Sequence, residues 1–185
     1  MEMQLNKSKT IAIDMDGVLA NVEPQLVKVY NTIYDTSITV ADIQGKTHAE
    51  AFPLDTKERR VIHTPGFFRH LEVMPGAIEV VRKLMKHFEV YVVSSAMEFP
   101  LSLDEKYDWL QAHFPFIDWR HIVFCGDKRI INTYYMIDDH CKNLDFFKGR
   151  TLLYHAHHNT EVTHHHRVKN WSEILHWFEK EMTFG

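Results

Sequence analysis

Five short apolar segments alternate along the chain with segments whose apolar residues recur every three or four positions. Nearly continuous apolar runs of strand length are typical of strands that are buried on both faces of a parallel sheet. The predicted strands are Thr10–Asp14, Glu89–Ser94, His121–Cys125, Thr133–Asp138 and Thr151–Tyr154. Strands that alternate with helices predict an α/β fold with a doubly wound, mostly parallel sheet.

Helical periodicity is clearest beyond residue 75. It covers Gly76–Phe88, Leu103–Phe114 and a last segment with Ile174, Leu175, Trp177 and Phe178. Asn170 precedes this last segment, and Glu173 follows three residues later, which is typical of a helix N-terminus. We therefore expect the last helix to begin at Asn170, with this residue as its N-cap.

The stretch from residue 21 to residue 74 breaks the alternation, because it holds no convincing strand. Its apolar spacing predicts helices at Val22–Tyr34 and Asp55–Ile62. A compact domain rarely contains a structureless loop of this length. We therefore expect a small helical cap, residues 21–74, inserted after the first strand into a core domain of residues 1–20 and 75–185. Ligands of open α/β sheets bind beyond the carboxyl ends of the strands, so the cap is well placed to act as a lid.

Composition and charge exclude several classes of protein. The 185 residues are 45% hydrophobic and 25% charged, which is unlike a disordered chain, and the net charge of −4 offers no positive field for a nucleic acid polymer. No run approaches the roughly 20 apolar residues of a membrane span, and the first residues do not resemble a secretory signal. Two cysteines, Cys125 and Cys141, are too few for a disulfide framework. We expect a cytoplasmic protein that binds no membrane; its oligomeric state stays open, with a homodimer as one candidate.

Two aspartates, Asp14 and Asp16, follow directly on the first predicted strand. Like charges this close raise each other's pKa unless a cation lies between them. Mg²⁺ suits such a pair, because it takes carboxylate, carbonyl and water oxygens, and Gly17 lets the backbone turn close to a ligand. An isolated pair of this kind is more often an Asx turn, so the pair alone does not decide between the two interpretations.

Three further strand ends carry polar groups. Ser94 and Ser95 end the second predicted strand, Lys128 follows the third, and Asp138 and Asp139 end the fourth. Each has an ordinary explanation as a turn, a loop or a helix cap. All of them, however, fall at the one edge of the sheet where ligands bind, and a lysine ammonium can neutralise a phosphate oxygen there. The joint pattern predicts a site for a phosphate and a divalent cation.

The order and spacing of these motifs resemble the haloacid dehalogenase superfamily of phosphohydrolases. Within it, seven segments resemble the 5′(3′)-deoxyribonucleotidases. They are DMDGVLA (14–20), TPGFFRHLEVMPGA (64–77), VVSSA (92–96), DEKYDWL (104–110), GDK (126–128), IDD (137–139) and HNTEVTHHHRVKNW (158–171). The resemblance implies a haloacid dehalogenase-type core with a helical cap. It also implies Mg²⁺-dependent hydrolysis of nucleoside monophosphates, chiefly deoxyribonucleoside 5′- or 3′-monophosphates, through an aspartyl-phosphate.

The resemblance also implies a role for each residue. Asp14 is expected to be the nucleophile, and Asp16 the general acid and later the base, with its carbonyl on the metal. Ser94, with Ser95 behind it, is expected to hydrogen-bond the phosphoryl oxygens, and Lys128 to balance their charge.

The same resemblance places Asp14, Asp16 and Asp139 on the metal, with Asp138 in an outer position or reached through water. Strand geometry alone leaves Asp138 and Asp139 undecided, because neighbouring side chains of a strand point to opposite faces.

Some residues depart from the family pattern. Val22 stands where the family has a substrate-contacting aromatic residue, and Gly126 where it has an arginine. The preferred base, sugar and phosphate position therefore stay open. Phe52, Phe67 and Phe68 could stack on a base, but we expect them in the core of the cap.

Three further features have ordinary explanations. A histidine-rich segment holds His155, His157, His158 and His164–His166. Imidazole suits zinc or nickel, but we do not expect a metal there, because the triplet lacks a cysteine or carboxylate partner at ligand spacing. Lys106 is expected to be a surface lysine rather than a cation near the site. Cys125 is expected to be an inert strand residue, since no activating base is evident.

Two alternatives to a nucleotidase remain. The same chemistry could act on another small phosphate ester, such as a phosphosugar, and the cap decides between these substrates because it contacts the leaving group. A catalytically silent nucleotide-binding protein on the same fold is disfavoured, because every motif residue is present.

Overall fold

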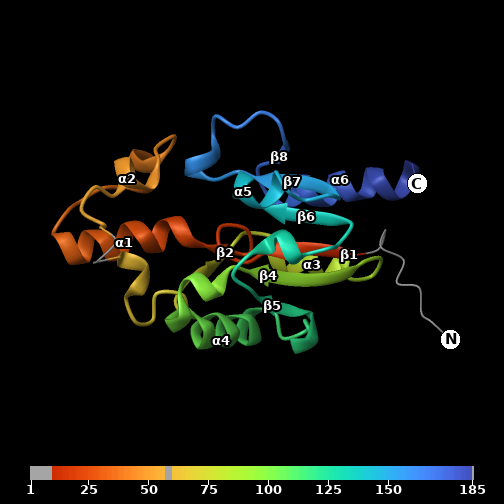
Figure 1. Ribbon diagram of the computed structural model, residues 1–185, viewed down its shortest axis with the longest axis horizontal. Coiled ribbons are helices and arrows are strands. Elements are labelled where there is room, and N and C mark those ends of the chain that lie inside the picture. Colours follow the sequence, from red (N-terminus) through yellow and green to blue (C-terminus); the bar gives the residue numbers. More distant parts are fainter. Residues whose placement is uncertain (1–9, 57–59, 185) are drawn as a thin grey trace.

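In the described part of the chain, six parallel strands form one sheet in the order β5-β4-β1-β6-β7-β8 (Figure 1). The computed structural model describes residues 10–56 and 60–184. The strands of this sheet are β1 (Thr10–Asp14), β4 (Glu89–Ser94), β5 (Ile122–Phe124), β6 (Tyr135–Asp138), β7 (Arg150–Tyr154) and β8 (His166–Val168). The predicted α/β fold with a doubly wound parallel sheet is confirmed.

Both faces of the sheet are covered by apolar clusters. The helices are α1 (Val22–Tyr34), α2 (His48–Ala51), α3 (Ala77–Leu84), α4 (Leu103–His113), α5 (Cys141–Leu144) and α6 (Trp171–Phe184). Ile11 and Ile13 of β1 belong to the larger cluster, whereas Ala12 belongs to a smaller one with Leu144 of α5. This alternation is that of a central strand with two buried faces. It explains why the β1 sequence reads as a continuous apolar run.

The observed strands differ from the predicted ones at their ends. β5 is shorter than predicted, because His121 ends a 3-10 turn, and β6 begins at Tyr135. β8 was missed altogether. In the described sheet it is an edge strand next to β7, and Val168 is its one buried residue, so it carries almost no apolar pattern.

The last helix confirms its predicted start. Oδ1 of Asn170 accepts the N–H of Glu173 at 2.9 Å, as an N-cap does. Nε1 of Trp171 donates to the carbonyl of Val18 at 2.9 Å and so joins α6 to the loop after β1. Among the described helices, none has the length and apolar character needed to cross a membrane.

The insertion after β1 begins and ends at a two-stranded antiparallel ladder of β2 (Ala20–Asn21) and β3 (Glu72–Val73). Between these strands lie α1, α2 and two 3-10 helices, Val40–Ile43 and Val61–His63. Figure 1 shows this helical part at one end of the molecule, beyond the C-terminal ends of β1 and β4. The helix predicted at Val22–Tyr34 is confirmed, and the division into two domains stays a prediction.

The helix predicted at Asp55–Ile62 is wrong for the residues that the structure describes; residues 57–59 lie outside them. Oδ1 of Asp55 accepts the N–H of Val61 at 2.6 Å, and its Oδ2 lies 2.7 Å from Nε2 of His48. The Asp55 carboxylate therefore holds the first residue of the 3-10 helix Val61–His63.

A short helix, α2, forms earlier in the cap, where none was predicted. The N–H of Thr47 donates to Oε2 of Glu50 at 2.9 Å, and the N–H of Glu50 donates to the Thr47 hydroxyl at 3.4 Å. This reciprocal capping box was readable from the Thr-x-x-Glu pattern.

Three phenylalanines form the core of the cap, as expected. Phe52, Phe67 and Phe68 are at most 2% exposed. The ring centroid of Phe52 lies 5.2 Å from that of Tyr30, and those of Phe67 and Phe68 lie 5.1 Å apart. Burying a side chain of this size contributes roughly 1.5–3 kcal/mol, so these rings stabilise the cap.

Candidate active site

Polar side chains at the ends of β1 and β6 and from the turn after β5 meet at one edge of the sheet. Nζ of Lys128 lies 2.6 Å from Oδ1 of Asp14 and 2.6 Å from Oδ2 of Asp138. Asp14 ends β1, Asp138 ends β6, and Lys128 lies in the turn after β5. All three are at most 6% exposed. Three residues that were singled out separately in the sequence therefore contact one another in the fold.

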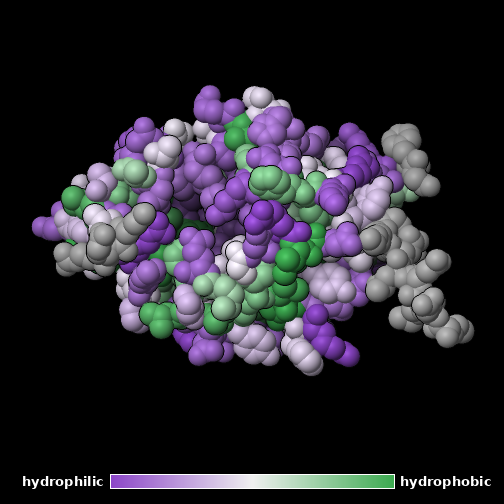
Figure 2. Space-filling model, viewed as in Figure 1, coloured by the Kyte–Doolittle hydropathy of each residue, from purple (hydrophilic) through white to green (hydrophobic). Residues whose placement is uncertain are grey.

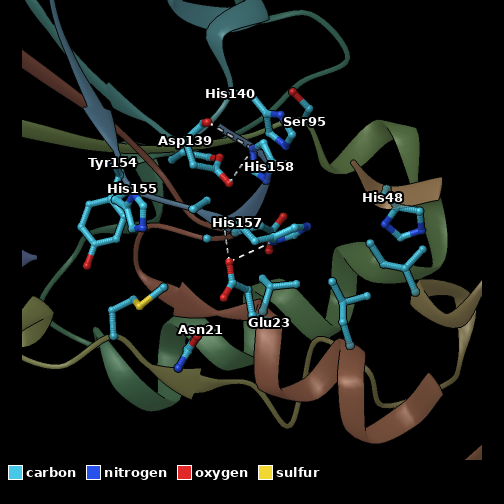
Figure 3. A pocket seen from close by; sticks show the side chains of 18 of the residues that line it. Asn21, Glu23, His48, Ser95, Asp139, His140, Tyr154, His155, His157 and His158 are labelled. Carbon is cyan, nitrogen blue, oxygen red and sulfur yellow. Dashed lines mark hydrogen bonds and ion pairs between the residues drawn. The ribbon is translucent and has the colours of Figure 1, made fainter. Parts of the chain in front are cut away.

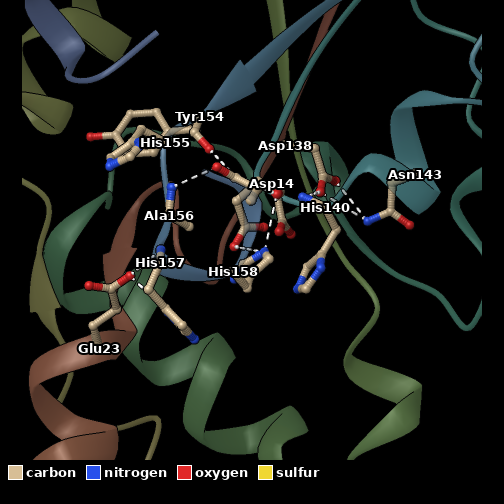
Figure 4. Close-up of polar contacts among 12 residues, drawn as sticks. Asp14, Glu23, Asp138, His140, Asn143, Tyr154, His155, Ala156, His157 and His158 are labelled. Carbon is tan, nitrogen blue, oxygen red and sulfur yellow. Dashed lines mark hydrogen bonds and ion pairs between the residues drawn. The ribbon is translucent and has the colours of Figure 1, made fainter. Parts of the chain in front are cut away.

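Lys128 carries a stable positive charge. Burial by itself would lower the pKa of its ammonium, but the carboxylates of Asp14 and Asp138 outweigh this effect and raise the pKa. Asp138 is fully engaged, because it also accepts the N–H of His140 at 2.9 Å and the amide of Asn143 at 3.0 Å (Figure 4). Asp138 therefore holds Lys128 in place.

Asp14 and Asp139 are buried carboxyl groups whose charge is only partly balanced. Burial raises the pKa of both well above the ordinary value; the neighbouring aspartates add to the effect, and Lys128 opposes it. Oδ1 of Asp14 accepts the N–H of Met15 at 2.8 Å and lies 2.6 Å from Nζ of Lys128, whereas Oδ2 makes no such contact with the residues that the structure describes. Among the described residues, Oδ1 of Asp139 has no hydrogen-bond partner. An uncompensated buried carboxylate costs several kcal/mol, so this group needs a cation.

The donor set fits a hard divalent cation. Asp14, Asp138 and Asp139 each offer a carboxylate oxygen, and these atoms lie within 4.8 Å of one another. Within the described chain, Oδ1 of Asp16 is also buried without a partner. An all-oxygen set of this kind suits Mg²⁺. Because Asp138 is saturated and Asp139 is not, the geometry favours Asp139 over Asp138 as a direct ligand.

Gly17 makes room for Asp139. A Cβ atom at position 17 would lie 2.4 Å from Oδ2 of Asp139, and the φ angle of Gly17 is +78°. Only glycine meets both conditions without strain.

Lys106 is not the surface lysine that the sequence suggested. Its side chain is 1% exposed, and its Nζ lies 2.5 Å from Oδ2 of Asp16 and 3.0 Å from Oγ of Ser94. The same Nζ lies 4.4 Å from the ring centroid of Phe68. The missed signal was helical spacing: Lys106 shares the buried face of α4 with Trp109 and Leu110.

The two serines differ in position. Ser94 is 1% exposed, and its hydroxyl lies among Asp16 and Lys106, whereas Ser95 lines the cavity described next. Val22, at the start of α1, lines the same cavity.

A cavity of about 760 Å³ opens from this edge of the sheet toward the cap. Figure 2 shows the surface hollowed at this place. Asp14, Asp16, Lys128 and Asp139 line one part of it. Residues of the cap and of the connection between β7 and β8, such as His48 and His155, line the rest (Figure 3). The volume lies within the roughly 300–1,000 Å³ range of small-molecule sites.

A pair of residues joins the cap to the core beside this cavity. Oε1 of Glu23 in α1 accepts the N–H of His157 at 2.8 Å and lies 2.9 Å from Nδ1 of the same residue (Figures 3 and 4). Burial would raise the pKa of Glu23, but the hydrogen bonds from His157 outweigh it and lower the pKa. We call this pair the Glu23–His157 clasp.

The backbone of Asp139 is also held by a residue that the sequence did not single out. Nδ2 of Asn159 donates to the Asp139 carbonyl at 2.8 Å and to that of Tyr154 at 2.8 Å. Asn159 and His157 follow β7 by only a few residues, so their strand-end position was the available signal.

Cys125 is buried, which raises the pKa of its thiol, in line with the expected inert residue.

Comparisons with known proteins agree with this geometry. The profile of the family described as 5′ nucleotidase, deoxy (pyrimidine), cytosolic type C matches residues 8–180. The 5′(3′)-deoxyribonucleotidase of Bacillus subtilis (strain 168) is 40% identical over 166 residues, which are 90% of this chain and 96% of the relative.

Solved structures share the fold at low sequence identity. A haloacid dehalogenase-like hydrolase from Streptococcus pneumoniae aligns with a TM-score of 0.63 at 10% identity, over 94% of this chain and 100% of the other. A haloacid dehalogenase family hydrolase from Deinococcus radiodurans, solved with bound phosphate and sodium, aligns with a TM-score of 0.59 at 14% identity, over 93% and 95%.

The resemblance drawn from the sequence, to haloacid dehalogenase-type phosphatases and to 5′(3′)-deoxyribonucleotidases among them, is therefore confirmed. The chain belongs to the 5′ nucleotidase, deoxy (pyrimidine), cytosolic type C family.

Proposed function

We propose that the protein is a Mg²⁺-dependent phosphomonoesterase that hydrolyses nucleoside monophosphates, chiefly deoxyribonucleoside 5′- or 3′-monophosphates. The observation that carries this proposal is the difference between the contacts of the two carboxylate oxygens of Asp14. Its Oδ1 is held by Lys128 and the Met15 N–H, while its Oδ2 is left for a substrate in the cavity. The similarity to an enzyme named 5′(3′)-deoxyribonucleotidase supports the choice of substrate.

In the first half of the reaction, Oδ2 of Asp14 attacks phosphorus, and the bond between phosphorus and the nucleoside oxygen breaks. A proton from the Asp16 carboxyl group passes to the leaving oxygen, so the nucleoside departs as an alcohol. Lys128 balances the charge of Asp14 and the phosphoryl oxygens. We propose that Ser95, which lines the cavity, donates its hydroxyl to these oxygens in place of Ser94, whose hydroxyl contacts Lys106 and Asp16.

In the second half, Asp16 takes a proton from water, and the water oxygen attacks phosphorus of the aspartyl-phosphate. The bond to Asp14 breaks, and inorganic phosphate leaves. Lys106 acts as a positioning residue for Asp16, because its Nζ contacts Oδ2, while Oδ1 has no hydrogen-bond partner among the described residues. The net reaction consumes one water and restores both carboxyl groups.

Asp14, Asp139 and the backbone carbonyl of Asp16 would hold Mg²⁺, with Asp138 behind them on Lys128. When bound, the ion neutralises charge on the phosphoryl group and on the carboxylates. This assignment accounts for the unpartnered, buried oxygen of Asp139.

The cavity volume admits a nucleoside monophosphate, but Val22, which lines the cavity, offers no ring on which a base could stack. The base, sugar and phosphate position are therefore questions for a substrate panel. We propose assays of phosphate release from dUMP, dTMP, their ribonucleotide counterparts, the 3′-monophosphates, a hexose phosphate and an aryl phosphate. Hydrolysis of every nucleotide no faster than of the aryl phosphate would contradict a nucleotidase.

The nucleophile is tested by Asp14→Asn, with Asp118→Asn as the control because that side chain lies on an exposed turn. We expect kcat to fall by at least about 10⁴-fold in Asp14→Asn and to stay unchanged in the control. Wild-type turnover in Asp14→Asn would contradict the mechanism.

We also propose that the protein acts in the cytoplasm, in line with two cysteines that are both free. A homodimer stays a hypothesis, which light scattering after size-exclusion chromatography would test.

A further inference from the structure

A second cluster of metal-ligating side chains lies apart from the active cavity. Nε2 of His164 lies 2.9 Å, and Nε2 of His165 2.8 Å, from the same atom, Oδ1 of Asp145. None of these three residues lines the cavity. Asp145 follows α5, and the histidines belong to the connection between β7 and β8. The carboxylate partner that the histidine triplet lacked in the sequence is thus supplied by the fold, 19 residues upstream of His164.

We propose that Asp145, His164 and His165 form a zinc site that is distinct from the Mg²⁺ site of the proposed mechanism. Two imidazole nitrogens and a carboxylate oxygen are a ligand set that zinc prefers and magnesium does not. Zinc held at about 2.0–2.2 Å in a tetrahedron separates its ligand atoms by roughly 3.3 Å. The two Nε2–Oδ1 distances, 2.9 and 2.8 Å, therefore need to lengthen by about 0.4–0.5 Å to admit the ion, and all three ligand atoms already lie within 4.8 Å of one another.

The surroundings of the cluster are those of a metal site. Nδ1 of His165 lies 3.1 Å from Oγ1 of Thr151 on β7, so the other ring nitrogen, Nε2, is aimed at Asp145. Metal-binding histidines usually have such a hydrogen bond on the nitrogen away from the metal. The His165 side chain is only 10% exposed, whereas those of His164 and Asp145 are 60% and 43% exposed. One ligand is thus fixed, and the open side leaves a path for the ion and room for water as a fourth ligand.

The charge of the cluster also suits a cation. Asp145 brings one carboxylate to the cluster, so an ion there meets a negatively charged ligand beside two imidazole nitrogens. Without a metal, both imidazoles must present an N–H to one carboxylate oxygen. With zinc, each nitrogen gives its lone pair to the ion instead.

A zinc ion here would fasten the connection between β7 and β8 to the end of α5. That connection also carries Asn159, whose amide holds the Asp139 carbonyl. The expected effect is a higher melting temperature, because an ion that binds only the folded state stabilises it. None of the three ligands takes part in the proposed phosphoryl transfer.

The site is tested by zinc titration calorimetry on the full chain in excess Mg²⁺, with thermal melts of the same samples. His164→Ala and Asp145→Asn remove ligands that are largely exposed, so both variants should fold. His166→Ala is the matched control, since this third histidine of the triplet is exposed and outside the cluster. Thr151→Val removes only the hydrogen bond behind His165.

We expect wild type and His166→Ala to bind one equivalent of zinc that His164→Ala and Asp145→Asn lose, together with the zinc-dependent rise in melting temperature. Thr151→Val should weaken binding by about 10–100-fold. Failure of wild type to bind zinc, or equal binding in all variants, would overturn the site. Phosphatase activity with Mg²⁺ should be the same in all variants, so this proposal and the proposed function can fail independently.

Discussion

Replacing Gly17 by alanine tests the geometry of the site most sharply. The new Cβ would lie 2.4 Å from Oδ2 of Asp139, whereas ordinary contact begins at 3.4 Å, so the carboxylate must move by 3.4 − 2.4 = 1.0 Å. A displacement of this size in a reacting group costs about 10²-fold in rate, or about 2.7 kcal/mol in transition-state stabilisation. The positive φ of Gly17 adds roughly 1–2 kcal/mol of backbone strain.

Gly76→Ala separates strain from displacement. Gly76 has a similar φ of +82°, but a Cβ there would meet its nearest neighbour, Cβ of Trp171, at an ordinary 3.5 Å. Both variants should therefore lose roughly 1–2 kcal/mol of stability, a fall in Tm of about 2–8 °C for a chain of this size. Only Gly17→Ala should also lose Mg²⁺ affinity and about 10²-fold in kcat/KM. These are measured by phosphate release and magnesium titration. Equal kcat/KM in the two variants would refute the placement of Asp139 at the reaction centre.

Three further predictions concern the charges around the site. Lys106→Met should lower kcat by about 10²-fold with little change in KM, because Asp16 loses the ammonium that positions it; Lys83→Met, on the exposed face of α3, should keep wild-type kinetics. Glu23→Gln should lower stability by about 1 kcal/mol at neutral pH through loss of the Glu23–His157 clasp. Folding lowers the pKa of Glu23, so the stability that its carboxylate contributes is fully present above the unfolded pKa and is lost as pH falls through the folded pKa. The difference in Tm between Glu23→Gln and wild type should therefore disappear in acid. A difference in Tm that does not change with pH would argue against the clasp. Chelation of Mg²⁺ should abolish turnover, and excess calcium should inhibit it, because calcium takes more ligands at longer distances; full activity with calcium as the sole cation would count against the assigned metal.

The central sheet could be predicted from the sequence because strands buried on both faces appear as continuous apolar runs. β1 and β4 have their predicted bounds, as continuous apolar runs that are paired on both sides. β8 and α2 were missed, because an edge strand needs only one buried residue and a helix of a single turn shows no periodicity. The cap depends on contacts of individual side chains, such as the carboxylate of Asp55 on Val61, which no pattern of apolar residues encodes.

The main acidic and basic residues of the site could be predicted because they follow strands whose ends share one edge. Which of these residues contact one another could not be predicted. Asp138 contacts Lys128 and Asn143, whereas Oδ1 of Asp139 has no hydrogen-bond partner among the described residues. This difference depends on the face of the sheet to which each side chain points, which the sequence does not show. Lys106 was misread because a lysine on a helix is usually solvated, and only its three-dimensional partners, Asp16 and Ser94, show otherwise.

A crystal structure with Mg²⁺ and beryllium trifluoride, a mimic of the phosphoryl group, would test the central claim most directly. We predict beryllium bonded to Oδ2 of Asp14, Lys128 on the other oxygen of that carboxylate, and the metal on Asp14 and Asp139. Beryllium bound without contact to Asp14, or a metal held by Asp138 with Lys128 displaced, would contradict the account.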